Sequence, residues 1–254
     1  MKIIVAIKQV PERDASLAVD PGGKWIDESE LNYGINEPDA YALEEALQLK
    51  EANGGEVIAL CAGPERVTST LREALAKGAD RAIHIEADDL NARDTLEVAQ
   101  MLAEAIRPES PDLVLTGLQS DDLGFGQTGV VLAELLGIPH STLILHVEKI
   151  TTGIRVNREL EDGWFQQIEI PLPALLTIQS GGNKLRYATL MGIKKAKTKE
   201  TRTVAAPAAA PASQLELVRV YLPEKQRQTQ MLTGTATEIA AKIVDKLRNE
   251  VKVL

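Results

Sequence analysis

The sequence is poor in the residues that build disulfide frameworks, cysteine-rich metal sites and aromatic stacking surfaces. A single cysteine, Cys61, excludes an internal disulfide and suits a reducing compartment. Aromatic residues make up only 3% of the chain, which argues against a platform that stacks single-stranded nucleic acid. The net charge of −9 has the wrong sign for a nucleic-acid or anionic-membrane surface, so we expect neither as a partner.

Long apolar runs are absent as well. No segment approaches the roughly 18 apolar residues that a membrane-spanning helix needs, so we expect no direct membrane insertion. Met1 leads directly into an apolar strand pattern, which leaves no room for a signal or transit peptide. We therefore expect a soluble, cytoplasmic protein.

The chain lacks the motifs of several catalytic classes. It has neither the G-x-x-x-x-G-K-[ST] phosphate loop nor the G-x-S-x-G nucleophile elbow. His84, His140 and His146 have no His or Glu partner at metal-site spacing, so we expect structural histidines and no metal. Cys61 ends a predicted buried strand and is expected in the core or in a pocket wall. The residues alone predict no catalytic centre.

Short apolar segments alternate with helical patterns through the first 136 residues. Strands are expected over residues 3–7, 56–60, 82–85 and 113–116, and helices over 36–53, 67–77, 94–107 and 127–136. Asn36 is expected to cap the first helix, and Asp94-x-x-Glu97 predicts a capping box. Near-continuous apolar strands between helices are typical of a doubly wound, Rossmann-like α/β domain with a mainly parallel sheet. Its ligands bind at the carboxyl ends of the strands, where the strand order reverses.

The stretch from residue 112 to 139 organises this domain. A predicted strand leads through a glycine-rich loop, which carries Asp121 and Asp122, into a helix that begins near Gln127. Such a junction leaves the first N–H groups of the helix unpaired, and with the helix dipole they form a site for phosphate. We expect the loop to hold a nucleotide phosphate. Solvated acids or ribose ligands are the favoured readings of Asp121 and Asp122, with an acid/base couple as the alternative.

The same loop also contains a dinucleotide-like motif. Gly124, Gly126 and Gly129 spell G-x-G-x-x-G, with Glu148 at about the distance of a ribose-binding acid. In a true NAD or FAD fingerprint the first glycine follows the strand directly, whereas here residues 117–123 intervene. We favour a different phosphate loop, with Gln127-Thr128-Gly129 at the helix start, and keep the fingerprint as the alternative.

The pattern changes after residue 139. Four β-rich segments separated by short turns predict a meander added to the sheet, over residues 141–147, 154–159, 165–170 and 174–178. Residues 181–200 are expected to form an irregular loop with a basic end, and 204–212 a Pro/Ala linker. A helix over 237–251 follows, with Thr235-x-x-Glu238 as its capping box, and its apolar side docks either on its own domain or on a partner subunit.

Two stretches of the second half carry a specific joint pattern. They are VNRELEDGWFQQI over residues 156–168, followed by PALLT at 173–177, and LRYATLMGIKKAK over 185–197. The N-terminal VAIKQVP, the NEPDAYALEEAL helix, the GAD after the second helix and GLQSDD…GQTG accompany them. Together these motifs closely resemble the electron transfer flavoprotein beta subunit over nearly the whole chain.

The resemblance implies a heterodimer in which an alpha subunit carries the redox-active FAD. The beta subunit would catalyse nothing alone; it would help to form the FAD site and wrap the partner with residues 201–254 as linker and arm, leaving residues 1–200 as the nucleotide-binding domain. Electrons would come from an acyl-CoA or related dehydrogenase, as in fatty acid β-oxidation, and pass to a quinone oxidoreductase. In most members the beta subunit buries a structural AMP, whereas in electron-bifurcating members a second FAD takes that place and accepts hydride from NADH.

Site residues follow from the same resemblance. Nucleotide contacts fall on Ala6, Asn36, Glu37, Pro38, Asp39, Ala62, Gly117, Gln119, Asp121, Asp122, Gly126, Gln127, Thr128 and Gly129. Partner docking falls on Glu159, Tyr187, Leu190, Ile193, Lys194, Lys195 and Lys197. Leu190 matches the family's docking leucine within the recognition loop at 181–200, and Glu159 matches a glutamate that is thought to steer the flavin domain. Without the resemblance, Leu190 would be read as a loop leucine folded back on its own domain.

The choice between AMP and a second FAD depends on departures from the two patterns. Leu118 stands where bifurcating members tend to carry an arginine, and Gln127-Thr128-Gly129 matches the AMP-binding members. The stretch over residues 36–44 instead matches bifurcating sequences. We favour AMP. A rival of another class is a stand-alone ATP/AMP-binding regulator of the universal-stress type, which leaves the Leu190 loop and the terminal helix unexplained.

Overall fold

The computed structural model describes residues 1–88, 90, 93–207, 215–223 and 229–253. The chain divides into two units, Met1–Val220 and Tyr221–Leu254. Among the described residues, no helix combines the length and the apolar character that crossing a bilayer requires.

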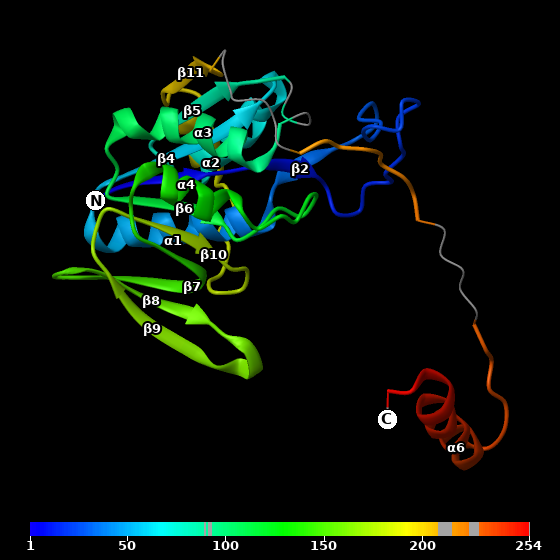
Figure 1. Cartoon of the computed structure of the whole chain (residues 1–254). Helices are drawn as coiled ribbons and strands as arrows, with labels where there is room; N and C mark the ends of the chain where they lie inside the picture. The colour runs from blue at the N-terminus through cyan, green and yellow to red at the C-terminus, as the bar shows by residue number, and fades with distance from the viewer. Residues whose placement is uncertain (89, 91–92, 208–214, 224–228, 254) are drawn as a thin grey trace. The chain divides into compact units, whose positions relative to one another are not determined.

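The first unit is built on a nine-stranded sheet (Figure 1). Its strands are β1 (Lys2–Ala6), β4 (Glu56–Gly63), β5 (Arg81–Glu86), β6 (Leu113–Gly117), β7 (His140–Ile150), β8 (Gly153–Glu159), β9 (Phe165–Ile170), β10 (Ala174–Ile178) and β11 (Thr201–Ala205). They lie in the order β11-β5-β4-β1-β6-β10-β7-β8-β9. Neighbours from β11 to β7 are parallel, and the β7–β8 and β8–β9 pairs are antiparallel. This is the expected α/β class, with a mainly parallel sheet.

Helices cover both faces of the sheet. They are α1 (Glu37–Asn53), α2 (Thr68–Lys77), α3 (Thr95–Ile106), α4 (Thr128–Leu136) and α5 (Leu190–Ala196), with short 3-10 turns at Glu65–Val67, Arg107–Glu109 and Glu161–Gly163. Residues of α1, α2 and α5 belong to one apolar cluster, and residues of α3 and α4 to the other. A separate antiparallel ladder, β2 (Gln9–Pro11) with β3 (Tyr33–Ile35), lies in the connection between β1 and α1.

The alternation of side chains along β1 explains why its sequence is apolar throughout. Ile3 and Val5 pack in the cluster under α1 and α2, and Ile4 packs in the cluster under α3 and α4. All three are fully buried. Each such side chain contributes about 1.5–3 kcal/mol on burial, so a strand covered on both faces carries no polar residue at these positions.

Most predicted elements are confirmed, and so are the capping box of α3 and the glycines that end α1 and α2. The carboxylate of Asp94 accepts the Glu97 N–H at 3.0 Å, and Glu97 returns a bond to the Asp94 N–H, as a capping box requires. Gly54 and Gly78, with φ of 70° and 139°, follow the last residues of α1 and α2. The Asn36 prediction was wrong in its chemistry. Asn36 occupies the cap position of α1, but its side chain makes no cap bond.

Residues 174–178 correct the predicted meander. Only β7, β8 and β9 form one, and β10 enters the sheet between β6 and β7, parallel to both. All five residues of β10 are buried. A fully apolar strand belongs inside a parallel sheet, and turn spacing alone misassigned it to a hairpin.

Two further predictions fail between residues 181 and 205. The expected irregular loop contains helix α5, whose start is capped by Thr189. The arm was expected from residue 201, but Thr201–Ala205 form edge strand β11 against β5, and the first unit extends to Val220. The largely polar and exposed residues of TRTVA fit an edge strand, which has a neighbour on one side only. Residues 208–212 of the predicted linker lie outside the described residues.

The second unit contains the predicted terminal helix. Helix α6 (Ala236–Lys246) continues into a π-helical turn at Leu247–Val251. The capping box of Thr235 and Glu238 is confirmed. Ile243 and Val244 are 44% and 46% exposed within the chain, so the apolar side of this helix is incompletely covered.

Candidate functional site

A cavity lies at the point where the strand order of the sheet reverses, between β1 and β6. Strand β1 has β4 on one side and β6 on the other, and the connecting helices α1 and α3 pack on opposite faces. The chain therefore leaves the carboxyl ends of the paired strands β1 and β6 toward opposite faces, through α1 and α4, and open α/β sheets bind ligands at such a point. The cavity there holds about 160 Å³. Its walls come from the ends of β1, β4 and β6 and from the first turns of α1, α3 and α4.

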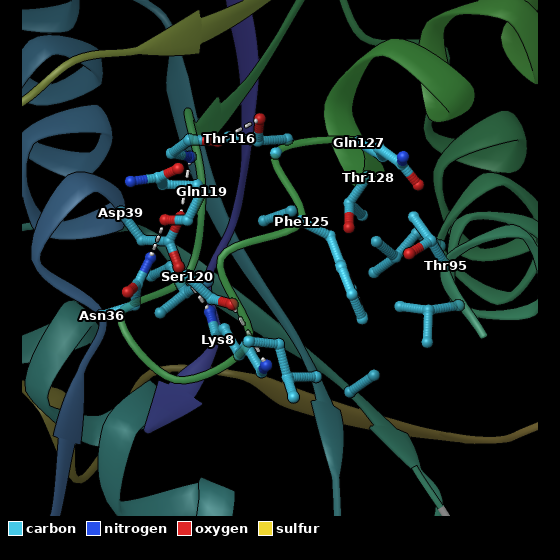
Figure 2. Close-up of a pocket in the computed structure, with 18 of the residues that line it drawn as sticks. Lys8, Asn36, Asp39, Thr95, Thr116, Gln119, Ser120, Phe125, Gln127 and Thr128 are labelled. Atoms are coloured by element: carbon cyan, nitrogen blue, oxygen red, sulfur yellow. Dashed lines mark hydrogen bonds between the residues drawn. The ribbon is translucent and has the colours of Figure 1, made fainter. Parts of the chain in front are cut away.

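Asn36 ties the glycine-rich loop to the start of α1. Its Nδ2 donates to the Gln119 carbonyl at 2.9 Å, and its Oδ1 accepts the Asp121 N–H at 2.9 Å. The side chain is 1% exposed. Because both of these amide contacts go to the loop, Asn36 fixes the backbone around Ser120 in place of capping its own helix (Figure 2).

Asp39 joins the ends of two neighbouring strands. One carboxylate oxygen accepts the Gly117 N–H at 2.7 Å and the other accepts the Lys8 N–H at 2.8 Å. Burial raises the pKa of this carboxyl to about 6, against the hydrogen bonds from Lys8, Gly117 and Asn36, which favour the ionised form. A Cβ at position 117 would come within 2.4 Å of the Asp39 carboxylate, so this contact requires glycine.

The two loop acids are engaged in ion pairs. Lys8 Nζ lies 2.7 Å from Asp122 Oδ1, and Arg13 contacts both Asp121, at 3.3 Å, and Glu37. Burial alone would raise the pKa of Asp122, but the charge and hydrogen bond of Lys8 outweigh it and the pKa lies below its usual value. Both carboxylates therefore hold the loop against residues 8–13.

Helix α4 begins at the opposite wall of the cavity. Its cap residue, Gln127, makes no side-chain cap bond, in contrast to the capping boxes of α3 and α6. Figure 2 shows Gln127 and Thr128 across the cavity from Asn36, Asp39 and Lys8, with Phe125 between the two sides. A Cβ at Gly129 would come within 2.5 Å of Thr177 and 2.7 Å of Thr116. Glycine thus lets the helix start pack closely against β6 and β10.

The structure brings most of the predicted nucleotide contacts together. The cavity is lined by Ala6, Asn36, Asp39, Ala62, Gly117, Gln119, Gly126, Gln127 and Thr128. Five predicted residues do not line it: Asp121 and Glu37 pair with Arg13, Asp122 pairs with Lys8, Pro38 packs near Gly117, and Gly129 packs on the strands.

Sequence reasoning missed the apolar wall and the cation at its edge. Leu90, Val98, Leu102 and Leu118 line the cavity from α3, its approach and the loop, and Lys8 lines it from the end of β1. The usable signal was the position of Lys8 directly after a buried strand, since such residues face the ligand edge of a parallel sheet.

The predicted docking residues fall into two groups. Tyr187, Leu190 and Ile193 are 92%, 82% and 46% exposed, on or just before α5, and Lys194, Lys195 and Lys197 are exposed beside them. Met191, at 62% exposed, was missed. Glu159 lies apart from them in sequence, on β8, where it accepts a 3.4 Å bond from Gln179.

His84 and the cysteine have structural surroundings, whereas His140 is exposed and the exposed His146 lies 3.2 Å from Glu45. His84 is fully buried, with Nε2 2.8 Å from the Gly63 carbonyl oxygen. Cys61 belongs to the core, where burial raises the pKa of its thiol to about 12. Over the part of the chain that the structure describes, no group of His, Cys, Asp or Glu side chains could hold a metal ion.

Known proteins are similar to this sequence over nearly its whole length. The family model of the electron transfer flavoprotein domain matches residues 24–209. The chain is 40% identical to the electron transfer flavoprotein subunit beta of Methylophilus methylotrophus over 264 residues, with 99% of each chain covered. The chain belongs to the electron transfer flavoprotein beta-subunit family.

Two further relatives are similar over nearly the whole chain. The subunit beta of Bacillus subtilis is 35% identical, with 100% of each chain covered. The acryloyl-CoA reductase electron transfer subunit gamma of Anaerotignum propionicum is 33% identical, with 97% of this chain and 98% of the relative covered. Membership implies that the chain works in association with flavin.

Proposed function

We propose that the chain is the beta subunit of a heterodimer in which an alpha subunit carries the redox-active FAD, and that it buries an AMP of structural role. It catalyses nothing alone. The heterodimer takes electrons from an acyl-CoA or related dehydrogenase and passes them to a quinone oxidoreductase. The observation that carries the nucleotide proposal is the cavity at the switch point, which ends on the uncapped start of α4.

The residues around the cavity fit an adenine nucleotide. Ala6, Ala62, Val98 and Leu102 offer an apolar wall for a base. The start of α4 offers backbone N–H groups and the positive end of a helix dipole for phosphate. No arginine lies at position 118, which suits a single phosphate over the diphosphate of a dinucleotide.

A second candidate, a bound FAD with an NADH site, is favoured by one observation. A larger cleft of about 730 Å³ adjoins the first cavity, and both are lined by Lys8, Ala62, Leu90 and Leu123. A ligand larger than a mononucleotide could extend into it, since drug-sized ligands fill about 300–1,000 Å³. One of the relatives is, by its name, an electron transfer subunit of an acryloyl-CoA reductase.

The nucleotide content of the purified heterodimer tests these proposals. One FAD and one AMP per heterodimer are expected after co-expression with the alpha subunit and extraction. Two FAD with NADH-driven flavin reduction would establish the second candidate. ATP on a homodimer of this chain would contradict both and support the universal-stress type of regulator.

A matched pair of glycine variants localises the nucleotide. Gly129→Ala should lower AMP content several-fold, because the new Cβ forces the start of α4 away from Thr116 and Thr177. Gly34→Ala is the control, since a Cβ at Gly34 meets nothing within 4 Å and should leave AMP content unchanged. Equal AMP content in both variants would remove α4 from the site.

The exposed apolar tip at Tyr187 and Leu190 is proposed as the surface that docks the dehydrogenase, with Glu159 steering the flavin-bearing part of the alpha subunit. Isolated exposed leucines are common, but here Leu190 adjoins Tyr187 and Met191 in a protein with few aromatic residues. Leu190→Ala should raise the dehydrogenase concentration needed for half-maximal flavin reduction about tenfold and leave FAD content intact. Unchanged kinetics would exclude Leu190 as an anchor.

We further propose that residues 221–254 form the arm that wraps the alpha subunit, and that the alpha subunit covers Ile243 and Val244.

A further inference from the structure

The apolar tip of the proposed docking surface, Tyr187 and Leu190, lies at the end of a segment with no regular secondary structure. Residues 179–189, between β10 and α5, form neither helix nor strand, yet Tyr187 and Leu190 stand almost fully out of the chain. An exposed anchor binds well only when it is already held in place, because ordering a loop on binding costs free energy. The contacts that hold this segment therefore bear on docking.

Arg186, directly before Tyr187, is tied to α1 by five hydrogen bonds. Its Nε and Nη2 donate to the two oxygens of Glu44 at 2.8 and 2.9 Å, and its backbone N–H donates to the same carboxylate at 3.2 Å. Its Nη1 and Nη2 donate to Glu51, two turns further along α1, at 2.5 and 3.2 Å. A guanidinium that pairs with two carboxylates of one helix has a single orientation.

The two ion pairs of Arg186 with Glu44 and Glu51 form a clamp on α1, and its inner half, the pair with Glu44, is shielded from water. The side chain of Glu44 is 5% exposed and that of Arg186 is 28% exposed. Burial raises the pKa of Glu44, but hydrogen bonds from Arg186 and Gln48 outweigh it and the pKa lies below the usual value. The carboxylate thus stays charged at neutral pH, and an ion pair of this kind is screened little by salt.

Two contacts fix the segment before Arg186. Asn183 Nδ2 donates to Glu45, the residue after Glu44 on α1, at 3.0 Å. A Cβ at Gly182 would lie 2.0 Å from the Leu145 carbonyl oxygen, so the backbone of the segment rests directly on β7. The approach to Tyr187 is therefore held by both α1 and β7.

Two contacts also fix the segment after Tyr187. Thr189 caps α5 by accepting the Gly192 N–H at 3.0 Å. A Cβ at Gly192 would lie 2.2 Å from the Ala76 carbonyl oxygen, so α5 is seated closely on α2. Tyr187 and Leu190 thus stand on a short span anchored at both ends, with Arg186 as the last anchor before the tip.

We infer that Arg186 is a positioning residue for docking, whose clamp on Glu44 and Glu51 holds Tyr187 and Leu190 in the arrangement that the electron donor meets. This inference rests on the proposed docking role of the Leu190 surface. Arg186 acts through the tip, because its guanidinium is occupied within the chain.

Docking kinetics of the heterodimer test the inference, with an acyl-CoA dehydrogenase of the same organism, reduced by its acyl-CoA, as the probe. Arg186→Ala should raise the dehydrogenase concentration for half-maximal flavin reduction about five- to tenfold and leave the maximal rate within about twofold, since the flavin is untouched. Arg186→Lys should recover only part of the loss, because an ammonium cannot pair with two carboxylates at once. Arg155→Ala is the matched control, as it removes an exposed arginine that pairs with Glu169 at the surface.

A double variant separates positioning from direct contact. In a Leu190→Ala background, Arg186→Ala should have almost no further effect, because the anchor that it places is already gone. Hydrogen exchange of residues 183–190, measured without the dehydrogenase, should quicken at least tenfold in Arg186→Ala. Glu51→Gln, which loosens only the exposed half of the clamp, provides a milder variant if Arg186→Ala folds poorly.

Each outcome decides between the proposals. Unchanged exchange, or an equal loss with and without Leu190, would overturn the positioning role of Arg186 and leave the docking role of Leu190 standing. If Leu190→Ala alone has no effect, the docking surface itself is wrong and the role of Arg186 falls with it.

Discussion

Asp39 carries a carboxyl group at a position where water is excluded and two strands meet. Its side chain accepts the N–H groups of Lys8 and Gly117, at the ends of β1 and β6. Neither hydrogen bond involves a charged partner, so they offset only part of the cost of burying the charge, and burial raises the pKa to about 6. Ionisation of Asp39, which lines the cavity, therefore costs free energy of folding near neutral pH.

This raised pKa predicts a stability effect with a definite sign. A carboxyl whose folded pKa lies above its unfolded value of about 3.9 stabilises the fold fully below that value, and the contribution is lost as pH rises through about 6. From pH 7.5 to pH 5 the wild type should gain about 1.4 kcal/mol of unfolding free energy relative to Asp39→Asn. Urea unfolding of both proteins at the two pH values measures this difference.

The comparison with Asp39→Asn removes the effects of other acids. Glu44 and Glu109 have lowered pKa values, so their stabilisation is lost on acidification in both proteins and cancels in the difference. The variant itself should be less stable by about 1–3 kcal/mol at any pH, since its amide NH₂ faces a backbone donor. A difference that does not change with pH would show that Asp39 titrates normally.

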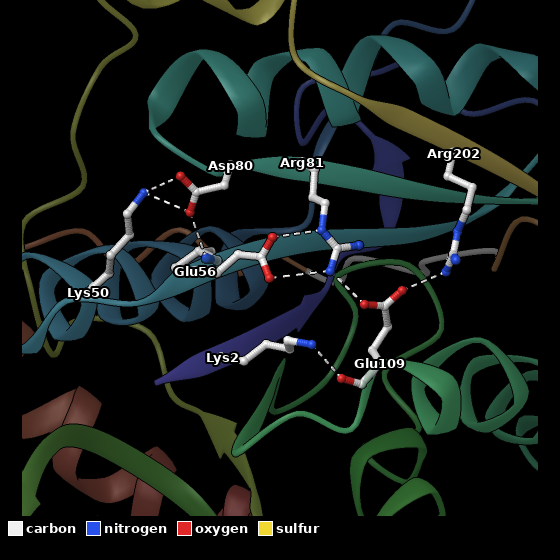
Figure 3. A network of polar contacts seen from close by, with 8 residues as sticks. Lys2, Lys50, Glu56, Asp80, Arg81, Glu109 and Arg202 are labelled. Carbon is white, nitrogen blue, oxygen red and sulfur yellow. Dashed lines mark hydrogen bonds and ion pairs between the residues drawn. The ribbon is translucent and has the colours of Figure 1, made fainter.

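At the scale of elements, Glu109 links parts of the sheet that are distant in sequence (Figure 3). Its carboxylate, 9% exposed, lies 2.6 Å from Arg81 on β5 and 2.7 Å from Arg202 on β11, and its carbonyl accepts a 2.7 Å bond from Lys2 on β1. Arg81 also pairs with Glu56 on β4 at 2.7 Å. The turn after α3 thereby fastens β11, the strand that sequence reasoning placed in the arm.

Removing this charge should destabilise the first unit. Glu109→Gln is expected to lower the unfolding free energy by about 1–3 kcal/mol, because it leaves two arginines short of a shielded partner. Glu169→Gln is the matched control: its ion pair with Arg155 is exposed on both sides, so a loss of about 0–0.5 kcal/mol is expected. Thermal or urea unfolding measures both, and equal losses would show that the Glu109 network contributes no more than a surface pair.

Local chemistry made many elements predictable from the sequence. The glycines after α1 and α2 and the capping boxes of α3 and α6 are signals that need only neighbouring residues. Strand β10 was misassigned because its partners β6 and β7 are not adjacent hairpin strands in sequence. Its composition, ALLTI, held the missing signal, as a strand buried on both faces shows no polar alternation.

Several residues of the candidate site were predictable from the sequence, but the contacts between them were not. Asn36 and Asp39 came from the family resemblance and the start of α4 from the strand–glycine loop–helix pattern, and the structure places all three around one cavity. The pairing of Lys8 with Asp122, 114 residues apart, could not be read from spacing, because charged pairs of this kind depend on the tertiary path. Arg186 lies within the LRYATLMGIKKAK stretch, but its pairing with Glu44 on α1 depends on the tertiary fold and could not be predicted from the sequence.

At the scale of the whole molecule, aromatic residues are placed outside the interior. None of the eight tryptophan, tyrosine and phenylalanine side chains is among the buried core residues. Phe125, Trp164, Phe165, Tyr187 and Tyr221 are each more than half exposed. Aliphatic side chains fill the core, while Trp25, Tyr33 and Tyr41 are partly buried. The five exposed aromatic side chains are of the kind that is enriched at recognition surfaces.

The insertion of β10 between β6 and β7 has a consequence for the order in which the chain acquires its shape during synthesis. Strand β6 pairs with β1 on one side. Its partner on the other side is residues 174–178, which are synthesised about 60 residues later. Gly129, the second residue of α4, packs on Thr177, and the Leu118 N–H donates to the Ile178 carbonyl. A nascent chain that ends at β9 therefore has an open central edge and an unformed ligand loop. The ribosome must release β10 before the walls of the cavity are complete.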